Sequence, residues 1–448
     1  MQALAVIDIG KTRSKILVAD PRGNLLEEVS TETSSSGTCL DAEGIWIWML
    51  QALRQLTLKH AISAVFPVAH GAAAALIDDR GLVRPILDYE TDLSEIDAAY
   101  NRLRSDFQAS HSPNLPHGLN LGRQLYWIQQ KHPKDWSAAR HILLYPQYWA
   151  WRLCGVAATE VTSLGSHTDL WQPAQRSYSG LAENIGVCEK MPPMHNAWDV
   201  LAKIAPDVAA ATGLPPYCAV YCGVHDSNAS FARFVGSRGK FSVVSTGTWV
   251  ICMANGVTPE LDPERDTLSN VDIFGNAIPC ARFMGGREFA EIRGKNSSTP
   301  SLEIAGDLVK HQRLVLPAFC KQGGPFSGHM GSLPEGSTGR ERASLASLYC
   351  AMVTDYCLEL IQASGPLYVE GRFITDPVFL AALASLRAPV LTSSEKSGTL
   401  AGAVSIVNIG TGQSRVPNDS IEVNTTITGM PAYQQQWRAA VAGGFTDA

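Results

Sequence analysis

The sequence has no long apolar run and no basic leader, and each absence excludes a class of protein. No run of about 18 apolar residues occurs, so we expect no membrane span. The opening residues, MQALAVIDIGK, are interrupted by Asp8 and have no basic region ahead of the apolar stretch. They are therefore not expected to act as a signal peptide, and a cytoplasmic location is expected.

Positive charge is also scarce. The chain has 36 Lys and Arg against 42 Asp and Glu, a net charge of −6, which argues against non-specific binding of nucleic acid. The hydrophobic content of 45% and charged content of 17% are typical of a globular protein with substantial cores. A chain of 448 residues is long enough for two or three domains, and we expect a monomer or a homodimer.

Paired cysteines of the CxxC type are missing, although the chain has ten cysteines. Cys218 and Cys222 have CxxxC spacing in an apolar context. This pattern favours buried thiols in a reducing compartment over a disulfide or a zinc site.

The first part of the chain reads as strands followed by a helix. Short turns separate three β-rich runs, at 4–10, 15–20 and 25–31, which predicts an antiparallel meander. A helical pattern at 41–58, with Asp41 as its N-cap, precedes an apolar strand at 61–71. This order predicts one mixed sheet with helices packed on it.

The later part repeats that pattern. Residues 238–256 again read as strand, tight turn and strand, and 345–362 as an apolar helix. Residues 366–386 and 388–410 each read as a strand followed by a helix, the second rich in Gly and Ala. The repetition predicts two halves that divide near residue 235. Between them, the aromatic residues of 90–215 are interpreted as core packing.

The segment DIGKTRSK (8–15) is the first candidate site. A carboxylate at a strand end precedes Gly10, Lys11 and Thr12, and backbone N–H groups in such turns form concave anion sites. Lys11 or Lys15 could neutralise phosphate charge, and Asp8 could hold Mg²⁺ through water. The alternative is an ordinary hairpin turn. The segment is not a Walker A loop, because the GxxxxGK[ST] spacing is absent.

The segment STGTW (245–249) has two threonines flanking a glycine between strands. Alone it is typical of a hairpin turn. Together with DIGKT it offers a second clamp for phosphate, which favours the functional interpretation of both turns.

The segment GVHDSNAS (223–230) places Asp226 at a strand-to-helix junction. An aspartate there is commonly a helix N-cap, but it could also accept the proton of a hydroxyl that attacks a phosphoryl group. A Ser/His/Asp hydrolase built from residues 225–227 is excluded, because adjacent side chains rarely converge and no GxSxG elbow exists.

The segment 68–90 ends an apolar strand in His70 and closes on Asp88, Tyr89 and Glu90. Polar groups at strand ends are suited to binding a polyol. The alternative for His70 is a structural role.

In this order, these motifs resemble the FGGY carbohydrate kinases of the actin/hexokinase-like ATPase superfamily. DIGKT resembles the family's first phosphate loop, DxGTT, with Lys11 in place of the first Thr, and VVSTGTW resembles the second. TGLPPYCAVYCGVHDSNA resembles the run that carries the catalytic base, QLYWIQQKHP the KLxWL segment, and SGTLAGAV the small-residue helix near adenosine. The similarity covers nearly the whole chain.

The resemblance implies an α/β fold of two actin/RNase H-like domains, each a mixed five-stranded sheet flanked by helices, with an interdomain cleft. It implies a sugar-binding domain at 1–235 and a nucleotide-binding domain at 236–448. The implied activity is ATP-dependent phosphorylation of a primary hydroxyl of a ketose or polyol, with ATP and Mg²⁺ required. The implied partners are the sugar and ATP, with no nucleic acid and no membrane.

The resemblance and the motifs together give each candidate residue a role. Asp226 is the expected catalytic base, and Asp8 and Asp226 the magnesium ligands, partly through water. The expected phosphate-binding residues are Asp8, Gly10, Lys11, Thr12, Lys15, Thr246, Gly247 and Thr248. The expected sugar-binding residues are His70, Gly71, Tyr89, Glu90, His225 and Asn228, and the adenosine-binding residues Gly324, Gly371, Arg372, Ala401 and Gly402.

The sequence also departs from the family pattern. The adenosine loop, EGRF, has a single Gly, and DYE stands where the family has its Trp-x-Asp-x-Arg sugar segment. These departures, with His70 at a strand end, favour a 6-deoxy-ketohexose such as L-rhamnulose or L-fuculose. The alternatives are a pentulose such as xylulose or ribulose, or a non-catalytic actin-like sensor of ATP or sugar.

Overall fold

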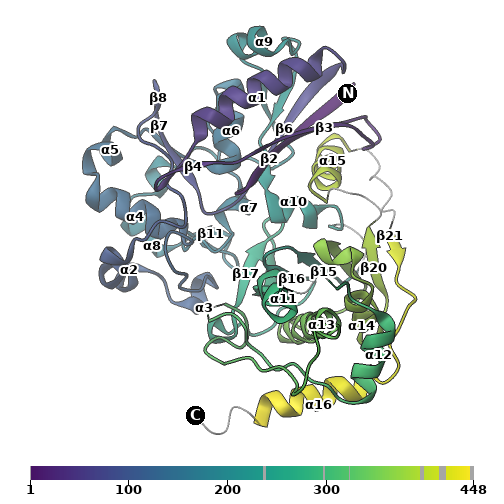
Figure 1. The fold of residues 1–448 in the computed structure, drawn as a ribbon. Helices are drawn as coiled ribbons and strands as arrows, with labels where there is room; N and C mark the ends of the chain where they lie inside the picture. The colour runs from purple at the N-terminus through teal and green to yellow at the C-terminus, as the bar shows by residue number, and fades with distance from the viewer. Residues whose placement is uncertain are drawn as a thin grey trace. The chain divides into compact units, whose positions relative to one another are not determined.

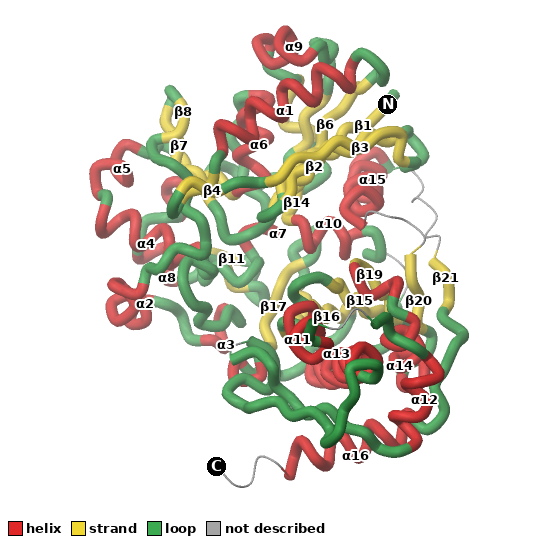
Figure 2. The backbone as a smooth tube through the Cα atoms, viewed as in Figure 1, coloured by secondary structure: helices red, strands yellow, loops and turns green. Residues whose placement is uncertain are grey.

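The computed structural model describes residues 2–235, 239–295, 298–321, 323–393, 398–412 and 420–443. The chain forms two compact units. Unit 1 contains Met1–Val235, Ser269–Ala277 and Ser397–Pro417, and unit 2 contains Gly236–Leu268, Ile278–Lys396 and Asn418–Ala448. Each unit is built on a mixed sheet flanked by helices, as predicted (Figures 1 and 2).

The two units differ in one respect from a simple division of the chain at residue 235. The sequence analysis assigned the segments 269–277 and 398–411 to the second domain, whereas both pack within unit 1. The second of these segments is helix α15 (Gly398–Thr411), which packs against α10 (Asp226–Ala232) and also contacts β1 (Ala3–Ile9). A late helix therefore completes the first unit.

The sheet of unit 1 has the strand order β12-β13-β6-β1-β2-β3, and β14 also pairs with β6. Its further strands are β2 (Arg13–Ala19), β3 (Leu25–Glu32), β6 (Ile62–Ala69), β12 (Val200–Lys203), β13 (Ala219–Tyr221) and β14 (Val224–His225). The predicted meander is confirmed, because β1, β2 and β3 pair antiparallel in sequence. Strand β6 is parallel to β1.

The second sheet has the order β17-β18-β16-β15-β19-β20-β21, and its residues belong to unit 2 except for Ser269–Val271 of β17 and Ala277 of β18. Its strands are β15 (Phe241–Thr246), β16 (Val250–Asn255), β17 (Thr267–Val271), β18 (Ala277–Phe283), β19 (Leu367–Gly371), β20 (Val390–Ser393) and β21 (Ser420–Glu422). The core β18-β16-β15-β19-β20 repeats the order of β3-β2-β1-β6-β13 in unit 1, as the sequence repetition predicted.

Each sheet nevertheless has seven strands, two more than the predicted five. The additional strands are β12 and β14 in the first sheet and β17 and β21 in the second. The shortest of them, β14, has 2 residues, and the longest, β17, has 5. Strands this short carry too little alternation of polar and apolar residues to be recognised in the sequence.

The sheet of unit 1 is covered by helices on both faces. Ile7 and Ile9 of β1 join one buried cluster, with α1 (Ala42–Thr57), α6 (Tyr145–Cys154) and α9 (Pro206–Thr212). Leu4 and Val6 join a second cluster with α10 and α15. This division follows from the period of two in a strand. Asp41 is the N-cap of α1, as predicted, and its carboxylate accepts the Gly44 N–H at 2.9 Å.

The rest of unit 1 is helical and loop-rich, around a three-stranded sheet of order β8-β7-β9. Its elements are β4 (Ser35–Ser36), β5 (Cys39–Leu40), β7 (Ala74–Asp78), β8 (Gly81–Leu82), β9 (His141–Leu144), β10 (Trp171–Gln172), β11 (Ser177–Tyr178), η1 (Ser94–Ile96), α2 (Asp97–Leu103), α3 (Phe107–Ser110), α4 (Leu121–Lys131), α5 (Pro133–Ala138), α7 (Val161–Leu164), α8 (Gly180–Asn184) and η2 (Cys188–Lys190). Tyr100, Tyr148 and Trp149 are fully buried here, which confirms the packing interpretation for these aromatic residues.

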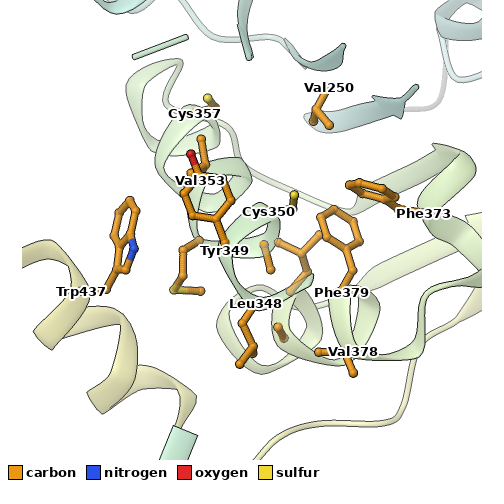
Figure 3. Packing of buried hydrophobic residues seen from close by; sticks show 14 of the residues in the cluster. Val250, Leu348, Tyr349, Cys350, Val353, Cys357, Phe373, Val378, Phe379 and Trp437 are labelled. Carbon is orange, nitrogen blue, oxygen red and sulfur yellow. The ribbon is translucent and has the colours of Figure 1, made fainter. Parts of the chain in front are cut away.

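The core of unit 2 surrounds α13 (Arg342–Leu360), which is buried along most of its length. Figure 3 shows Tyr349 and Leu348 of α13 near Phe379 and Trp437. Such a helix is apolar all round because it has no solvent face. The remaining elements are η3 (Pro263–Arg265), α11 (Gly285–Arg293), α12 (Leu302–Lys310), η4 (Arg372–Thr375), α14 (Pro377–Leu386) and α16 (Met430–Gly443).

Within the described ranges, no helix combines the length and hydrophobicity needed to cross a membrane. The ten cysteines, all of them in described segments, are free thiols. Cys218 and Cys222 are buried, as predicted, and burial raises the pKa of the Cys218 thiol to about 12.

Candidate functional site

The candidate residues of unit 1 gather where three strands end together. Ile9 of β1 and His225 of β14 both pair with Ala69 of β6, and both strands run parallel to β6. The segments that follow these strand ends therefore begin at the same edge of the sheet. This is the edge at which open α/β sheets bind their ligands.

Asp226 is the first residue of α10, and His225 occupies the N-cap position. The cap alternative for Asp226 is therefore wrong, since the residue lies inside the helix. Its carboxylate accepts the Ser227 N–H at 2.6 Å and the Ser227 hydroxyl at 3.3 Å. The side chain is 35% exposed, so Asp226 is held locally but remains open to a ligand.

Asp8 lies in β1 one residue before its end, opposite Lys15 of β2. Burial, and secondly the negative charge of Asp226, raise the pKa of the Asp8 carboxyl to about 7. Lys15 and a hydrogen bond from the Thr399 side chain oppose this increase. The negative charges of Asp8 and Asp226 therefore repel each other, and a cation between them would reduce this repulsion.

Lys11 is bound to the loop that was predicted to hold the sugar. Its ammonium donates to Asp88, lies 3.7 Å from a Glu90 carboxylate oxygen and stands 4.7 Å from the centre of the Tyr89 ring. The sequence analysis assigned Lys11 to phosphate, and that role stays a prediction, because its positive charge is paired here with these two acids. The contact also brings in Asp88, which was given no binding role of its own.

Asp88 is the anchor of this loop. It accepts from Lys11 and from the Ser35 hydroxyl at 2.9 Å. Burial opposes ionisation of Asp88, but the Glu90 N–H, Lys11 and Ser35 outweigh it, so its pKa lies below the ordinary value. The carboxylate is thus ionised and fully engaged.

His70 is buried, and its Nδ1–H donates to the Gly71 carbonyl at 2.8 Å. Burial lowers the pKa of His70, as do the positive charges of Lys11 and His225, while Gly71 and Asp226 act in the opposite sense. The ring is therefore neutral and leaves Nε2 as a hydrogen-bond acceptor. Nε2 has no partner among the described residues, which suits a hydroxyl donor from a ligand.

Gln124 is hydrogen-bonded to the turn that follows His70. The buried Gln124 amide donates to the Ala72 carbonyl at 2.7 Å and the Gly118 carbonyl at 2.6 Å. The uncharged Gln124, which stands where the resembling family usually has Lys, thus supplies both donors to these two backbone carbonyls.

His225 and Asn228 are both buried. His225 Nδ1 lies 2.8 Å from the Asn228 amide oxygen, and the Asn228 amide nitrogen donates to the Val271 carbonyl. The predicted sugar contact of Asn228 is therefore corrected. The residue is only 3% exposed, and its side chain is hydrogen-bonded to His225 and Val271 within unit 1. Gly71 faces the same ring, and a Cβ at Gly71 would lie 2.6 Å from His225 Nε2.

The three residues of the STGTW turn that were predicted to bind phosphate differ in hydrogen bonding and exposure. The Thr246 hydroxyl is buried; it donates to the Glu370 carbonyl and accepts the Phe373 N–H at 2.9 Å. This use corrects the phosphate role predicted for the Thr246 side chain. The Gly247 N–H closes the turn on the Trp249 carbonyl at 2.8 Å, and Thr248 is exposed at its tip.

The residues predicted to bind adenosine also differ in exposure. Arg372 is exposed, and Gly371 adopts a φ of 83° beside the Thr246 carbonyl, where an added Cβ would lie 2.0 Å from that oxygen. Gly324 is buried, and its N–H donates to Asp266 at 2.8 Å, so its predicted adenosine contact is corrected.

Ala401 and Gly402 lie in α15 of unit 1 and are buried. A Cβ at Gly402 would stand 1.7 Å from the Ala229 carbonyl oxygen of α10. Small residues in this helix thus permit close helix packing, and the adenosine role of Ala401 and Gly402 stays a prediction.

The structure holds no group of three or more His, Cys, Asp or Glu side chains arranged for a metal ion, within the segments it describes. The predicted magnesium pair, Asp8 and Asp226, consists of two carboxylates whose charges interact. Mg²⁺ is commonly bound by one or two carboxylates together with substrate phosphates. The two residues therefore fit such an ion, provided that phosphate completes its coordination.

The sequence analysis missed Thr399 as part of this site, and it named Asp88 among the polar groups of the segment 68–90 without giving it a binding role of its own. Thr399 is distant in the chain from its partner Asp8, and no local pattern marks that pairing. Asp88 did carry a signal, since it begins the DYE segment that was singled out as a sugar-binding element.

Comparison with known families gives two matches that together cover most of the chain. The family model described as "FGGY family of carbohydrate kinases, N-terminal domain" matches residues 3–232, and that described as "Carbohydrate kinase FGGY, C-terminal domain" matches residues 238–415. The gap between the two matches contains the division near residue 235.

A solved carbohydrate kinase from Novosphingobium aromaticivorans is 35% identical, with a TM-score of 0.90 over 98% of this chain and 100% of that one. A xylulose kinase from Lactobacillus acidophilus shares the fold, with a TM-score of 0.80, 16% identity and coverage of 99% and 96%. An L-fuculokinase of Haemophilus influenzae is 29% identical over 160 residues, which are 34% of this chain and 32% of that protein. A probable L-xylulose kinase of Pasteurella multocida is 23% identical over 281 residues, 58% and 56% of the two chains. The chain thus matches a third to just over half of the length of these two curated relatives.

Proposed function

Because this chain belongs to the FGGY family of carbohydrate kinases, we propose that it transfers the γ-phosphoryl group of ATP to a primary hydroxyl of a ketose or polyol. The favoured acceptor is a 6-deoxy-ketohexose such as L-fuculose or L-rhamnulose. The similarity to an L-fuculokinase supports this acceptor, and the similarity to a probable L-xylulose kinase supports a pentulose as the alternative.

Asp226 is the proposed general base. Its carboxylate accepts the proton of the sugar hydroxyl as that oxygen forms a bond to the γ-phosphorus and the bond from γ-phosphorus to the bridging oxygen of ATP breaks. Its 35% exposure and its place at the shared strand end support this role.

Phosphate binding in unit 1 falls to the turn after β1 that the Gly10 N–H closes on the Arg13 carbonyl, with the exposed Thr12 and the ammonium of Lys15. In unit 2 it falls to the turn that Gly247 closes, with the exposed side chain of Thr248. Asp8 and Asp226 would hold Mg²⁺, partly through water. When bound, that ion neutralises phosphate charge in the transition state. The raised pKa of Asp8, about 7, supports this assignment, since a nearby cation would favour the ionised carboxylate.

Sugar binding is proposed for the residues around His70. Its neutral, unpartnered Nε2 accepts a hydrogen bond from a sugar hydroxyl. Tyr89 and the exposed Glu90 offer a hydroxyl and a carboxylate from the loop that Lys11 and Asp88 anchor. For adenosine, Gly371 and the exposed Arg372 are the candidates in unit 2.

The observation that carries the proposal is the convergence of Asp8, His70 and Asp226 at the aligned ends of β1, β6 and β14. The test is Asp226→Asn, which keeps the size and polarity of the side chain but removes its basicity. We expect turnover to fall about 10²-fold or more, while ATP binding is retained. Turnover would be measured by ADP release with a panel of ketoses and polyols, and ATP binding by calorimetry.

A matched control is Asp207→Asn. Asp207 is likewise an acid in the first turn of a seven-residue helix, α9, and it is exposed. Normal turnover in Asp226→Asn would refute the base assignment. ATP or sugar binding without phosphorylation of any acceptor in the panel would instead support the alternative of a non-catalytic sensor.

A further inference from the structure

We propose that Lys11, paired with Asp88, is a positioning residue of the sugar site. The pair holds Tyr89 beside His70, and the matched charge of Lys11 restricts the acceptor to an uncharged sugar. This proposal rests on the kinase function given above and names the charge class of its acceptor. It differs from the sequence analysis, which assigned Lys11 to phosphate from its place in the DIGKT turn. Contacts inside unit 1 carry it.

The ammonium of Lys11 contacts all three residues of the DYE segment. It donates a hydrogen bond to Asp88, lies 3.7 Å from a Glu90 carboxylate oxygen and stands 4.7 Å from the centre of the Tyr89 ring. The face of an aromatic ring attracts a cation at this distance. The Lys11 side chain is only 19% exposed, so solvent screens its charge only in part. The turn after β1 therefore brings its lysine to the sugar loop.

Asp88 depends on this ammonium, because its carboxylate is buried. The side chain is 6% exposed. One oxygen accepts from Lys11 and from the Ser35 hydroxyl at 2.9 Å, and the other accepts the Glu90 N–H at 3.0 Å. Without Lys11, only uncharged donors would remain for a buried negative charge, which is strongly destabilising. A move of Lys11 to a phosphate would leave that charge unmatched, so the pair favours the sugar loop as the place of Lys11.

The pair fixes the position of Tyr89, which lies between the two acids in the chain. The hydrogen bond from the Glu90 N–H to the Asp88 carboxylate closes a turn around Tyr89. The Tyr89 ring meets the His70 ring edge-on, with centres 5.8 Å apart and planes at 83°. His70 Nε2, the proposed acceptor for a sugar hydroxyl, has no partner among the described residues. Lys11 therefore acts on the sugar through Tyr89 and not by contact with it.

The charges around the site favour an uncharged acceptor. A carboxylate ligand is bound well by a cation whose charge is not already matched. The charge of Lys11 is matched by Asp88 and Glu90, and Lys15 is assigned to phosphate above. Asp226, with a side chain 35% exposed, adds a further carboxylate. A sugar acid would bring another negative charge to these groups, and the complex of Mg²⁺ with ATP, itself an anion, would not attract it.

The first test measures binding and does not depend on turnover. Lys11→Met keeps the length of the side chain and removes its charge. We expect it to weaken the binding of L-fuculose, L-rhamnulose or L-xylulose, whichever the unaltered protein binds, about tenfold, the cost of one unmatched buried group. The binding of ATP should change less than about twofold. Calorimetry with each sugar and with ATP measures both.

A conservative variant separates charge from packing in this test. Lys11→Arg should restore part of the sugar affinity, because a guanidinium can also pair with Asp88. The urea midpoint of each variant shows that it is folded. Weaker ATP binding with unchanged sugar binding in Lys11→Met would return Lys11 to the phosphates and overturn the proposal.

The second test is a double-variant cycle. Asp88→Asn should raise the sugar KM as Lys11→Met does, with the ATP KM changed less than about twofold. The double variant should lose little more than either single variant, because the two residues act as one unit. Lys59→Met is the matched control and should change neither KM, since the Lys59 ammonium also pairs with an acid, Glu27 at 2.7 Å, but its side chain is 60% exposed. Full additivity in the cycle would overturn the proposal.

The third test concerns the charge of the acceptor. D-gluconate and D-xylonate have a primary hydroxyl, as the ketoses do, but carry a carboxylate. We expect the unaltered protein to phosphorylate the best ketose of the panel with a kcat/KM at least about tenfold above that for either acid. Glu90→Gln removes one of the charges that face Lys11, so it should raise the acid-to-ketose ratio of kcat/KM about threefold, as expected for an exposed charge. A sugar acid used as efficiently as the best ketose would refute the charge class.

The outcomes separate the two proposals. If the unaltered protein binds a sugar but phosphorylates no acceptor in the panel, the proposed function fails, and the calorimetric comparison of sugar with ATP still decides the role of Lys11. If it binds no sugar, both proposals fail. An active enzyme in which Lys11→Met weakens ATP binding and leaves sugar binding unchanged refutes the inference about Lys11 alone.

Discussion

Asp8 links the stability of the fold to the chemistry of the site. In an unfolded chain its pKa is near 3.8, whereas burial and the charge of Asp226 raise it to about 7 in the fold. The folded protein therefore binds this proton more tightly than the unfolded chain does. By linkage, the free energy of unfolding decreases as pH rises from about 4 to about 7, and this contribution is constant outside that window.

Asp8→Asn should remove this pH dependence, because Asn cannot ionise. Relative to the unaltered protein, we expect the variant to gain up to about 4 kcal/mol in free energy of unfolding between pH 4 and pH 7, at about 1.4 kcal/mol per pKa unit. Urea denaturation in EDTA at several pH values measures the difference, with Asp207→Asn as the exposed control. An unchanged difference across this range would contradict the assignment of the raised pKa to Asp8.

At this scale, the sequence predicted which residues surround the site better than what each one does. Asp8, His70 and Asp226 were predicted from their places at strand ends, and the parallel register brings those ends together. Thr246 and Asn228 were assigned to ligands, but both are buried and hydrogen-bonded within the fold. A motif shows which side chains lie near a turn; which way each one points depends on distant partners such as Val271 and Glu370.

At the scale of elements, the contact between α10 and α15 positions Asp226, the proposed base. Asp226 begins α10, Thr399 near the start of α15 is hydrogen-bonded to Asp8, and Gly402 lies against the Ala229 carbonyl. Because the two helices are this close, any added side-chain atom at Gly402 must push them apart.

Gly402→Ala should therefore be strongly destabilising. The new Cβ would be 1.7 Å from a backbone oxygen, so a helix must move. We expect a loss of about 3 kcal/mol, at the upper end for overpacked sites, measured as a lower urea midpoint. Gly306→Ala is the matched control, since Gly306 lies within α12 with no atom within 4 Å of an added Cβ. That variant should gain up to about 1 kcal/mol from helix propensity. Equal stability of the two variants would contradict the close packing.

Regular elements were predictable where their patterns are long. The meander of β1 to β3, the cap of α1 and the apolar α13 follow from period and turn residues. The short strands β12 and β14 were not predicted, because their hydrogen bonds to neighbouring strands define them rather than their own composition.

At the scale of the whole molecule, unit 1 is assembled from three separate stretches of chain. Leu400, Val404 and Val407 of α15 share a buried cluster with Val6 and Phe66 of the sheet. The repetition in the sequence located the division near 235, but it could not show that a helix from beyond residue 390 returns to the first unit. Such a return depends on which apolar face remains uncovered, and that is a property of the folded sheet.

A fragment of residues 1–235 should therefore not fold cooperatively by itself, because it lacks the α15 side chains that cover one face of its sheet. We expect this fragment to bind the dye ANS and to unfold over a broad range of urea. Joining residues 398–412 to it through a flexible Gly/Ser linker should restore part of the buried cluster and sharpen the transition. The matched control carries the same linker and segment with Leu400, Val404 and Val407 changed to Ser. Cooperative unfolding of residues 1–235 alone would show that α15 is dispensable for the first unit.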